Sequence, residues 1–394
     1  MNIFVSSHYK NTPNDLQLLS DAPAHQIFVL LGPIAEGSAD GLPDILCAVQ
    51  VCFEGDINKQ TIADHLKRGL RPSGDLIPWT VSEQFQDESF ASLSGIRVVR
   101  IATHPNAQGR GYGSRALELL IKYFEGSLID FDNVKTNELA ELKAKPAPQK
   151  DSSEKSLTEE KIKAKKHVQP ILQKLSERKP APLHYIGTSF GVTKELFSFW
   201  RKNAFVPIYL RQTANELTGE HTCVMIRPIN LSDESVQLSI KPQTVGSGDS
   251  IEESSWVSSY YLDFKKRLTN LFGFEFRSLP CSLAFQFIGE KNQNAGSTEA
   301  QEDQTIIDSI KREDLEKHIS MFDLRRLDSY SKNMVDFHLV LDLVPTLAKL
   351  FFTKTTLPKG SVNLSYVQSA ILIGFGLQYK KVEDIEADLG LNSN

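Results

Sequence analysis

One stretch, residues 97–126, constrains the fold of this chain more than any other. It reads RVVRIATHPNAQGRGYGSRALELLIKYFEG and changes from strand-like alternation to helical spacing part-way along. In its second half, Leu117, Leu120, Ile121 and Phe124 fall on one face of a helix. A strand, a glycine loop and an amphipathic helix in this order are typical of an α/β domain, in which the helix covers one face of the sheet.

The loop between this strand and this helix predicts a binding site for a pyrophosphate. Glycine lets the backbone turn and removes side chains that would block a ligand, and the N-terminus of the next helix carries a positive dipole end. The spacing matches neither GxGxxG nor GxxxxGK followed by Ser or Thr, which disfavours a Rossmann site and a P-loop. The alternative is a glycine turn that binds nothing. The candidate residues are Gln108, Gly109, Arg110, Gly111, Tyr112, Gly113 and Ser114.

Shorter apolar runs predict the remaining elements. Strands are expected at 26–31, 45–53, 96–102, 185–190, 206–211 and 222–226, and a helix at 193–203. Helical spacing dominates later, at 256–272, 332–352 and 363–377. We expect Pro345 to kink or interrupt the second of these helices. Together the runs predict an α/β fold followed by a mainly α-helical tail.

Two breaks in composition divide the chain. Residues 133–182 are rich in charge, and no Phe, Tyr or Trp occurs between Phe131 and Tyr185. Such a segment cannot bury enough apolar surface to offset its ordering entropy, so we expect a mobile insertion. Residues 232–255, rich in Ser, Gly and acid, predict a linker. The predicted domains are therefore 1–231, containing the insertion, and 256–394.

The composition argues against several classes of protein. Hydrophobic residues make up 40% and charged residues 24%, as in soluble globular proteins, and no apolar run is long enough to cross a bilayer. We expect a soluble, non-secreted protein with no membrane partner. The net charge of −5 opposes a uniformly basic surface but not a local basic groove. Cysteine and histidine spacing predicts no metal site, and we expect buried free thiols at Cys47, Cys52, Cys223 and Cys281.

The pattern Gln-x-x-Gly-x-Gly between a strand and a helix resembles motif A of the GNAT acetyltransferases. Longer strings narrow the resemblance, among them SHYKNTPNDLQLLSDAPAH (7–25), GDLIPW (74–79), FWRKNAFVPIYLRQTANELTGEH (199–221) and SAILIGFGLQYKKVEDIE (369–386). They are similar to the eukaryotic RNA cytidine acetyltransferase family, almost from end to end. The resemblance implies a GNAT fold, with a mixed, splayed central sheet flanked by helices. It also implies transfer of acetyl from acetyl-CoA to N4 of cytidine in small-subunit ribosomal RNA and some transfer RNAs.

The same resemblance assigns roles to residues. The backbone of Ile101, Ala102 and Thr103 would bind the pantetheine arm of the cofactor, and Lys202, where the family usually has Arg, or its neighbour Arg201 would reach its phosphates. The alternative for these two residues is a solvated basic pair near a helix C-terminus. Cytosine N4 must lose a proton as it attacks, so a general base helps. The resemblance suggests His8 and Tyr9 for this step.

Alternatives to these catalytic residues stay open. His8 and Tyr9 could simply pack the edge of the domain. His25, His104 and His221 compete with His8 as general bases, although His104 is expected to shape the cofactor loop and His221 to lie in a turn before a strand.

Basic residues interleaved with aromatic residues in the tail suggest contacts with RNA phosphates and bases. They are Lys265, Lys266, Arg267, Arg325 and Arg326. Aromatic residues on helices more often belong to a core, which is the alternative.

Family members carry a helicase-like, ATP-using module before the region that this chain resembles, so we expect the chain to be a fragment that uses ATP only together with such a module. The resemblance further implies RNA as partner, an adaptor RNA or protein that guides the chain, a homodimer, and a nuclear or nucleolar location. Two rival functions remain. One is acetylation of protein lysines or N-termini, and the other is a non-catalytic role in RNA binding or ribosome assembly.

Overall fold

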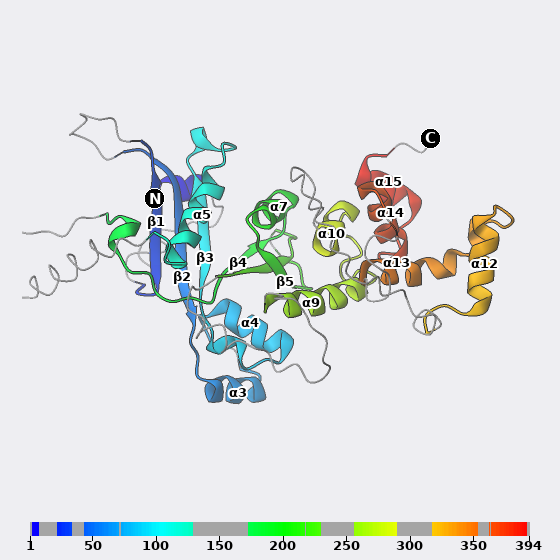
Figure 1. Ribbon diagram of the computed structural model, residues 1–394, viewed down its shortest axis with the longest axis horizontal. Helices are drawn as coiled ribbons and strands as arrows, with labels where there is room; N and C mark the ends of the chain where they lie inside the picture. Colours follow the sequence, from blue (N-terminus) through cyan, green and yellow to red (C-terminus); the bar gives the residue numbers. More distant parts are fainter. Residues whose placement is uncertain are drawn as a thin grey trace, which may run out of the picture. The chain divides into compact units, whose positions relative to one another are not determined.

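The computed structural model describes residues 2–7, 22–33, 43–70, 72–128, 172–216, 218–229, 256–289, 317–353, 362 and 364–391. Contacts within the chain form two compact units (Figure 1). The first contains residues 1–188 and 227–248, and the second contains residues 189–226 and 249–394. Most of the expected insertion and the whole expected linker lie outside the described residues.

A mixed β-sheet organises the first unit, as the sequence predicts. Its strands are β1 (His25–Leu31), β2 (Ile45–Gly55), β3 (Ser94–Thr103) and β4 (Tyr185–Gly191), in the order β1-β2-β3-β4. β1 pairs with β2 and β2 with β3 in antiparallel fashion, whereas β3 and β4 run parallel. A parallel pair needs a crossover connection, and helix α5 (Tyr112–Phe124) lies in that connection.

The pairing of β3 changes along its length. Its register with β2 passes from Val51↔Val98 to Gln50↔Arg100, so that Val99 is an extra residue on β3, a β-bulge. The parallel register with β4 joins Gly95–Val98 to Tyr185–Thr188, while the register with β2 continues to Thr103. Residues 99–103 therefore extend past the register with β4, beginning at the bulge.

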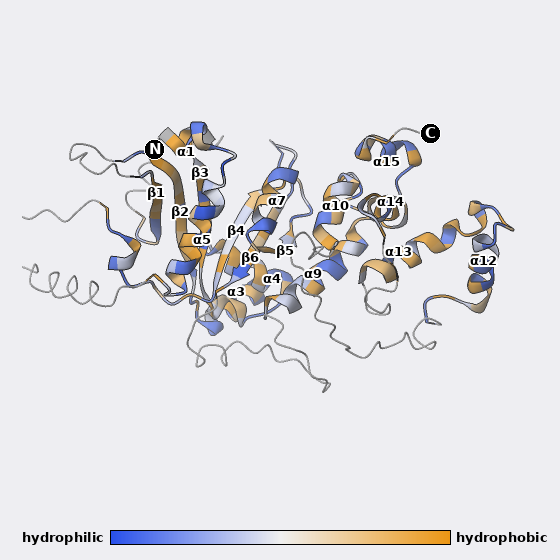
Figure 2. Cartoon of the chain, turned by 45° about the horizontal axis from the view of Figure 1, so that its top comes forward, coloured by the Kyte–Doolittle hydropathy of each residue, from blue (hydrophilic) through white to orange (hydrophobic). Residues whose placement is uncertain are grey.

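Helices cover both faces of this sheet. Helix α5 packs on one face through Tyr123 and Phe124, whose rings lie 5.9 and 6.0 Å from the ring of Phe28. Leu117, Leu120, Ile121 and Phe124 are all buried, which confirms the predicted apolar face. Helix α1 (Asn2–Ser7) packs on the opposite face, where Phe4 contacts Ala48 and Ala102. Much of β2 is hydrophobic (Figure 2), consistent with burial from two sides.

Two helices between β2 and β3 close one end of the unit. They are α3 (Lys59–Arg68), capped by the Asn58 side chain, and α4 (Leu76–Phe85). Ile62, Trp79 and Ala91 form a small core between α3, α4 and the 3-10 turn η1 (Phe90–Ser92). At the base of α4, the buried carboxylate of Glu54 accepts a hydrogen bond from the Ile77 N–H at 3.1 Å.

A glycine in β3 makes room for an aromatic ring of the neighbouring strand β4. A Cβ on Gly95 of β3 would lie 2.2 Å from Cζ of Tyr185, the residue opposite it on β4. The Tyr185 ring is fully buried, 5.2 Å from the ring of Phe90. Among the described residues its hydroxyl has no hydrogen-bond partner, and burial raises the pKa of Tyr185. The ring occupies the space that a side chain at position 95 would need.

The second unit combines a β-hairpin with helices. β5 (Val206–Leu210) pairs antiparallel with β6 (Thr222–Pro228), near helix α7 (Lys194–Lys202). The rings of Phe197 and Phe287 lie 4.3 Å apart in its core. The tail helices are α9 (Val257–Leu271), α10 (Cys281–Ile288), α12 (Met321–Ser331), α13 (Val344–Thr353), α14 (Tyr366–Gly376) and α15 (Val382–Leu389).

One expectation about the tail is wrong. Residues 332–352 are not one helix interrupted at Pro345, because two 3-10 turns, η5 (Phe337–Leu339) and η6 (Leu341–Leu343), precede α13. Pro345 is the second residue of α13. The first turn of a helix has no intrahelical partner for its N–H groups, so proline is tolerated there without a kink.

The four cysteines are free thiols, as predicted. Cys47, Cys223 and Cys281 are buried and Cys52 is half-buried, and burial raises the pKa of each thiol. Within the described ranges, no cluster of His, Cys, Asp or Glu has the geometry to hold a metal ion. No described helix is long and apolar enough to span a membrane.

Candidate functional site

The predicted cofactor loop begins in a short turn tied to the sheet. His104 donates its N–H to the Leu46 carbonyl at 2.8 Å, and its ring Nδ1 accepts from the Asn106 N–H at 3.3 Å. His104 thus caps the 3-10 turn η2 (Pro105–Ala107) and shapes the approach to the loop, as the sequence suggests. The next residue, Gln108, reaches back with its side-chain amide to the Thr103 carbonyl at 3.5 Å.

Two glycines turn the chain from this loop into α5. Gly109 has φ +72° and Gly111 has φ +85°, both in the left-handed region that L side chains rarely adopt. A Cβ built on either residue would meet nothing within 4 Å. The requirement for glycine is therefore conformational, and the space beside the loop is open. This geometry has the shape expected of a cradle for a ligand.

The N-terminus of α5 adds the electrostatic part of the cradle. Gly111 caps the helix without a side-chain hydrogen bond, and the intrahelical ladder starts with the Arg115 N–H donating to the Gly111 carbonyl at 3.0 Å. The N–H groups of Tyr112 and Gly113 precede that ladder, and no acidic residue lies in the first turn. An anion at this end would be stabilised by the helix dipole.

The three β3 residues expected to bind the pantetheine arm lead directly to the loop. Ala102 is buried against Phe4 of α1, and the Thr103 hydroxyl lies 3.8 Å from the Cys47 sulfur. Ile101 pairs with β2 on one edge of the strand. Because residues 101–103 lie beyond the parallel register with β4, the other edge of β3 meets the geometric requirement for added-strand binding of an extended ligand.

The structure brings only some of the predicted site residues together. The β3 segment and residues 108–114 share the first unit, whereas Lys202 ends α7 in the second unit, exposed. His8 and Tyr9 lie outside the described residues. They directly follow α1, which Phe4 anchors to Ala102.

A chain of polar side chains on the α1 side of the sheet was missed by sequence reasoning. Gln50 is 2% exposed, and its amide lies between Arg100 and His25. The Arg100 guanidinium donates to Gln50 Oε1 at 3.2 Å, and Gln50 Nε2 lies 2.8 Å from His25 Nδ1. Nearby, Arg97 forms an ion pair with Glu54. The available signal was the polar residue within the apolar run ILCAVQVCF, opposite arginines on the next strand.

The basic residues of the tail differ widely in their surroundings. Lys265 is only 8% exposed, whereas Lys266 is exposed on the same helix. Arg267 forms an ion pair with Asp263. On α12, Arg326 forms ion pairs with both Asp323 and Asp342, and these hydrogen bonds raise its pKa. Its neighbour Arg325 is exposed, with its guanidinium 5.9 Å from the centre of the Phe322 ring.

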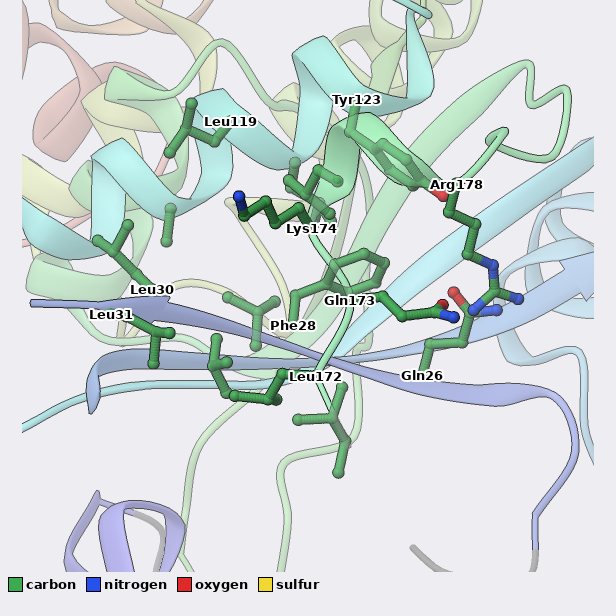
Figure 3. Close-up of a pocket in the computed structure, with 16 residues that line it drawn as sticks. Gln26, Phe28, Leu30, Leu31, Leu119, Tyr123, Leu172, Gln173, Lys174 and Arg178 are labelled. Carbon is green, nitrogen blue, oxygen red and sulfur yellow. The ribbon is translucent and has the colours of Figure 1, made fainter. Parts of the chain in front are cut away.

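A separate cavity of about 820 Å³ lies along β1 on the α5 side of the sheet (Figure 3). Residues 172–178 form its outer wall, which places the end of the expected insertion against the first unit. Gln26, Gln173 and Arg178 gather at one end, away from Leu30, Leu31 and Leu119 (Figure 3). None of the sequence-predicted site residues lines this cavity.

Comparison with protein-family models shows which family contains these strands, this loop and these helices. The family model described as GNAT acetyltransferase 2 matches residues 1–230. This chain belongs to that family. In this member of the GNAT acetyltransferase 2 family, a second model, described as a possible tRNA binding domain, matches residues 256–394.

Curated relatives are similar to this family member along its whole length. It is 46% identical over 400 residues to an RNA cytidine acetyltransferase of Dictyostelium discoideum, covering 100% of this chain and 36% of that protein. Proteins of the same name from Mus musculus and Saccharomyces cerevisiae are each 44% identical, with 100% of this chain and 35% of each relative covered. The chain thus spans about a third of the length of these relatives. Among solved structures, a ribosomal-protein-S18-alanine N-acetyltransferase from Escherichia coli aligns over 59% of this chain and 87% of that chain, at 10% identity and a TM-score of 0.27.

Proposed function

We propose that this chain transfers an acetyl group from acetyl-CoA to N4 of cytidine in RNA. The observation that carries the proposal is the loop with two left-handed glycines between β3 and α5, in a chain of the GNAT acetyltransferase 2 family. The names of the relatives, and the match of the tail to a possible tRNA binding domain, support RNA cytidine as the acceptor.

Acetyl-CoA would lie along the edge of β3 beyond its register with β4. Its pyrophosphate would accept hydrogen bonds from N–H groups of residues 108–114, and the dipole of α5 would stabilise its charge. The backbone of residues 101–103 would hold the pantetheine arm as an added strand. Lys202 would contact the nucleotide phosphates, a role that depends on how the two units are arranged.

The reaction would be a direct transfer within one site. Cytosine N4 attacks the thioester carbonyl, the N–C bond forms, the C–S bond breaks, and coenzyme A leaves as a thiol once its sulfur gains a proton. The N4 lone pair is delocalised into the ring, so holding the two substrates together and removing the N4 proton both lower the barrier. We propose His8 as the proton acceptor, because imidazole titrates near neutral pH. Tyr9 would relay the proton or stack on the base.

On the RNA side, exposure separates the five candidates. We assign phosphate contacts to Lys266 and Arg325, which are exposed, and a weaker contribution to Arg267, which is shared with Asp263. Lys265 and Arg326 take part in packing and ion pairing. A possible adaptor, a homodimer, ATP use with a helicase-like module, and a nucleolar location stay predictions from the resemblance.

Transfer of labelled acetyl groups tests the proposal. The chain is incubated with acetyl-CoA, labelled in the acetyl group, and either cytidine-containing RNA or unmodified protein, and the RNA is then digested to nucleosides and analysed by mass spectrometry. We expect label in N4-acetylcytidine. Label in lysine or N-terminal amines instead would establish the protein acetyltransferase alternative. Acetyl-CoA binding in calorimetry without any transfer would favour the non-catalytic one.

A further inference from the structure

The polar side chains of Arg100, Gln50 and His25 lie on the side of the sheet that helix α1 covers. Gln50 pairs with Arg100 across β2 and β3, and Ala48 pairs with Ala102 two residues further along. Side chains two residues apart on a strand share a face. Phe4 of α1 contacts Ala48 and Ala102, so the three polar side chains share that face with α1, which ends at Ser7, one residue before His8 in the sequence.

The donors and acceptors in this chain have only one consistent arrangement. A guanidinium can only donate, so the Gln50 oxygen must face Arg100. The Gln50 NH₂ group therefore faces His25 and must donate to Nδ1. His25 Nδ1 then carries a lone pair, and the ring proton lies on Nε2. Each member depends on the next, and the buried amide of Gln50 orients the Arg100 side chain.

The position of Arg100 on β3 is set by the bulge. Arg100 follows the extra residue Val99, where the register with β4 has ended. If the pyrophosphate lies at the loop after Thr103, the arm of the cofactor runs back along β3. At about 3.3 Å per residue, the strand from Thr103 to Val99 spans roughly 13 Å. The thioester end of the arm would then lie near the bulge and close to Arg100.

We propose that Arg100, oriented by Gln50 and His25, positions the acceptor nucleotide beside the thioester by donating hydrogen bonds to one of its oxygen or ring-nitrogen acceptors. The inference rests on the proposed acetylation of RNA cytidine and adds the group that holds the acceptor. Cytosine presents O2 and N3 next to its N4 amine, and the RNA backbone presents phosphate oxygens. Arginine suits both, because its donors form a rigid planar fork.

The state of His25 makes this positioning sensitive to pH. Burial first, and then the charges of Arg97 and Arg100, lower the pKa of His25, while Glu54 opposes them. The neutral ring is therefore favoured in the folded protein at neutral pH. Protonation at acid pH would place an N–H of His25 against the NH₂ of Gln50, and the amide could no longer hold both neighbours. The neutral His25 therefore contributes to the stability of the folded protein. This contribution is complete above the ordinary pKa of 6.5 and is lost as the pH falls through the lower pKa of the folded state.

The test of Arg100 compares the Arg100→Gln variant with wild type and with Arg68→Gln, which removes an exposed cation at the end of α3. Measured for each protein are the acetyl-CoA dissociation constant by calorimetry, the dissociation constant of a cytidine-containing RNA by fluorescence anisotropy, and KM and kcat for that RNA. We expect Arg100→Gln to raise the RNA dissociation constant and KM by about ten-fold or more. Acetyl-CoA affinity should stay within two-fold, and Arg68→Gln should resemble wild type. RNA affinity within two-fold of wild type in Arg100→Gln overturns the proposal.

The salt dependence of RNA binding shows whether Arg100 donates to a phosphate oxygen or to the cytosine base. A contact with phosphate contributes to counterion release, so its loss lowers the slope of log K against log salt by roughly 0.7 for single-stranded RNA. Loss of a contact with cytosine O2 or N3 leaves the slope unchanged. Loss of the N3 contact also reduces the preference for cytidine over uridine, whose N3 is a donor, whereas loss of the O2 contact does not, because both bases carry that oxygen. Either pattern, together with the affinity loss, supports the positioning role and identifies the atom bound.

Variants of the two supporting residues test the orientation mechanism. His25→Asn keeps an acceptor near the position of Nδ1 but does not titrate, whereas His25→Leu removes the acceptor. Wild-type KM for RNA should rise between pH 7.5 and pH 5.5, and this rise should disappear in His25→Asn, whose KM at pH 7.5 stays near wild type. His25→Leu and Gln50→Leu should raise KM at both pH values with kcat less affected. The same acid rise in His25→Asn as in wild type would show that His25 does not orient Arg100.

Two measurements need no turnover and separate this inference from the proposed function. Nitrogen-15 NMR of the wild-type protein should report an unprotonated Nδ1 and a protonated Nε2 in His25 at pH 7.5. This measurement stays valid even when the Gln50→Leu variant fails to fold. RNA affinity likewise needs no acetyl transfer. If wild type makes no N4-acetylcytidine, the proposed function fails while these two results still decide whether Arg100 holds RNA. The reverse tautomer of His25 contradicts the mechanism.

Discussion

The cofactor loop and the basic residues of the tail were both predicted from sequence, but the structure treats them differently. In the loop, the predicted chemistry belongs to the backbone, and Gly109 and Gly111 adopt the left-handed conformations that their identity suggests. In the tail, the predicted chemistry belongs to side chains, and their environments range from exposed Lys266 to Lys265 at 8% exposure. A site made by backbone is read directly from residue type. A site made by side chains depends on packing that the local sequence does not determine.

The strongest test of this comparison replaces a loop glycine. Gly111→Glu should weaken acetyl-CoA binding by roughly 100-fold, because it strains the backbone, repels the pyrophosphate and disrupts two or more charge-assisted hydrogen bonds. Gly69→Glu is the matched control, because Gly69 also has positive φ with open space around it but ends α3 instead. Both variants carry a similar conformational cost of about 1–2 kcal/mol. Equal acetyl-CoA affinities of the two variants in calorimetry would mean that the loop is not the cradle.

Removal of the proposed general base should lower the rate of acetyl transfer by a similar factor. His8→Ala should lower kcat by roughly 100-fold while acetyl-CoA affinity barely changes, because a general base acts on the acceptor side of the thioester. The acid limb of kcat should also vanish in this variant, whereas the acid limb of KM should follow His25. Tyr9→Phe should cost less if the ring stacks and about as much if the hydroxyl relays the proton. Single-turnover rates across pH provide the measurement, and near-normal turnover in His8→Ala would make His8 structural.

Smaller effects should sort the basic residues of the tail by exposure. Lys266→Ala and Arg325→Ala should each weaken RNA binding by about 1 kcal/mol, roughly five-fold, for RNAs of any sequence. Lys265→Met and Arg326→Gln should change RNA affinity by less than two-fold. Arg326→Gln should instead lower the thermal midpoint of the tail, because Asp323 and Asp342 lose their shared partner. If all four variants lost RNA affinity equally, exposure would not be the deciding property.

The smallest effect is expected from shortening the insertion. Replacing residues 133–168 by a short Gly/Ser linker should leave the acetyl-CoA dissociation constant within two-fold, because loop-closure entropy changes slowly with length. The replacement keeps residues 172–178, which line the cavity beside β1. Loss of cooperative unfolding in this variant would show that the removed residues belong to the folded core.

Features that depend on residues close together in the sequence were predicted, and features that depend on residues far apart were not. Strands β1, β2, β3, β4, β5 and β6 and helix α5 were all predicted, because apolar periodicity over five to thirteen residues is a local property. The bulge at Val99 and the Gln50–Arg100 contact were not, because both depend on register between strands about fifty residues apart. The effect of Pro345 was predicted wrongly, because it depends on where the helix starts.

The close approach of Tyr185 to Gly95 has an evolutionary consequence. With the Tyr185 ring 2.2 Å from where a Cβ at position 95 would lie, neither site can change freely while the other stays as it is. A relative with a side chain at the first position should carry a smaller residue at the second, and substitutions at the two sites should be inherited as a pair. A single substitution, Gly95→Ala, should be deleterious, whereas the double change with Tyr185→Leu should restore folding. The two strands are thus linked by mutational epistasis as well as by hydrogen bonds.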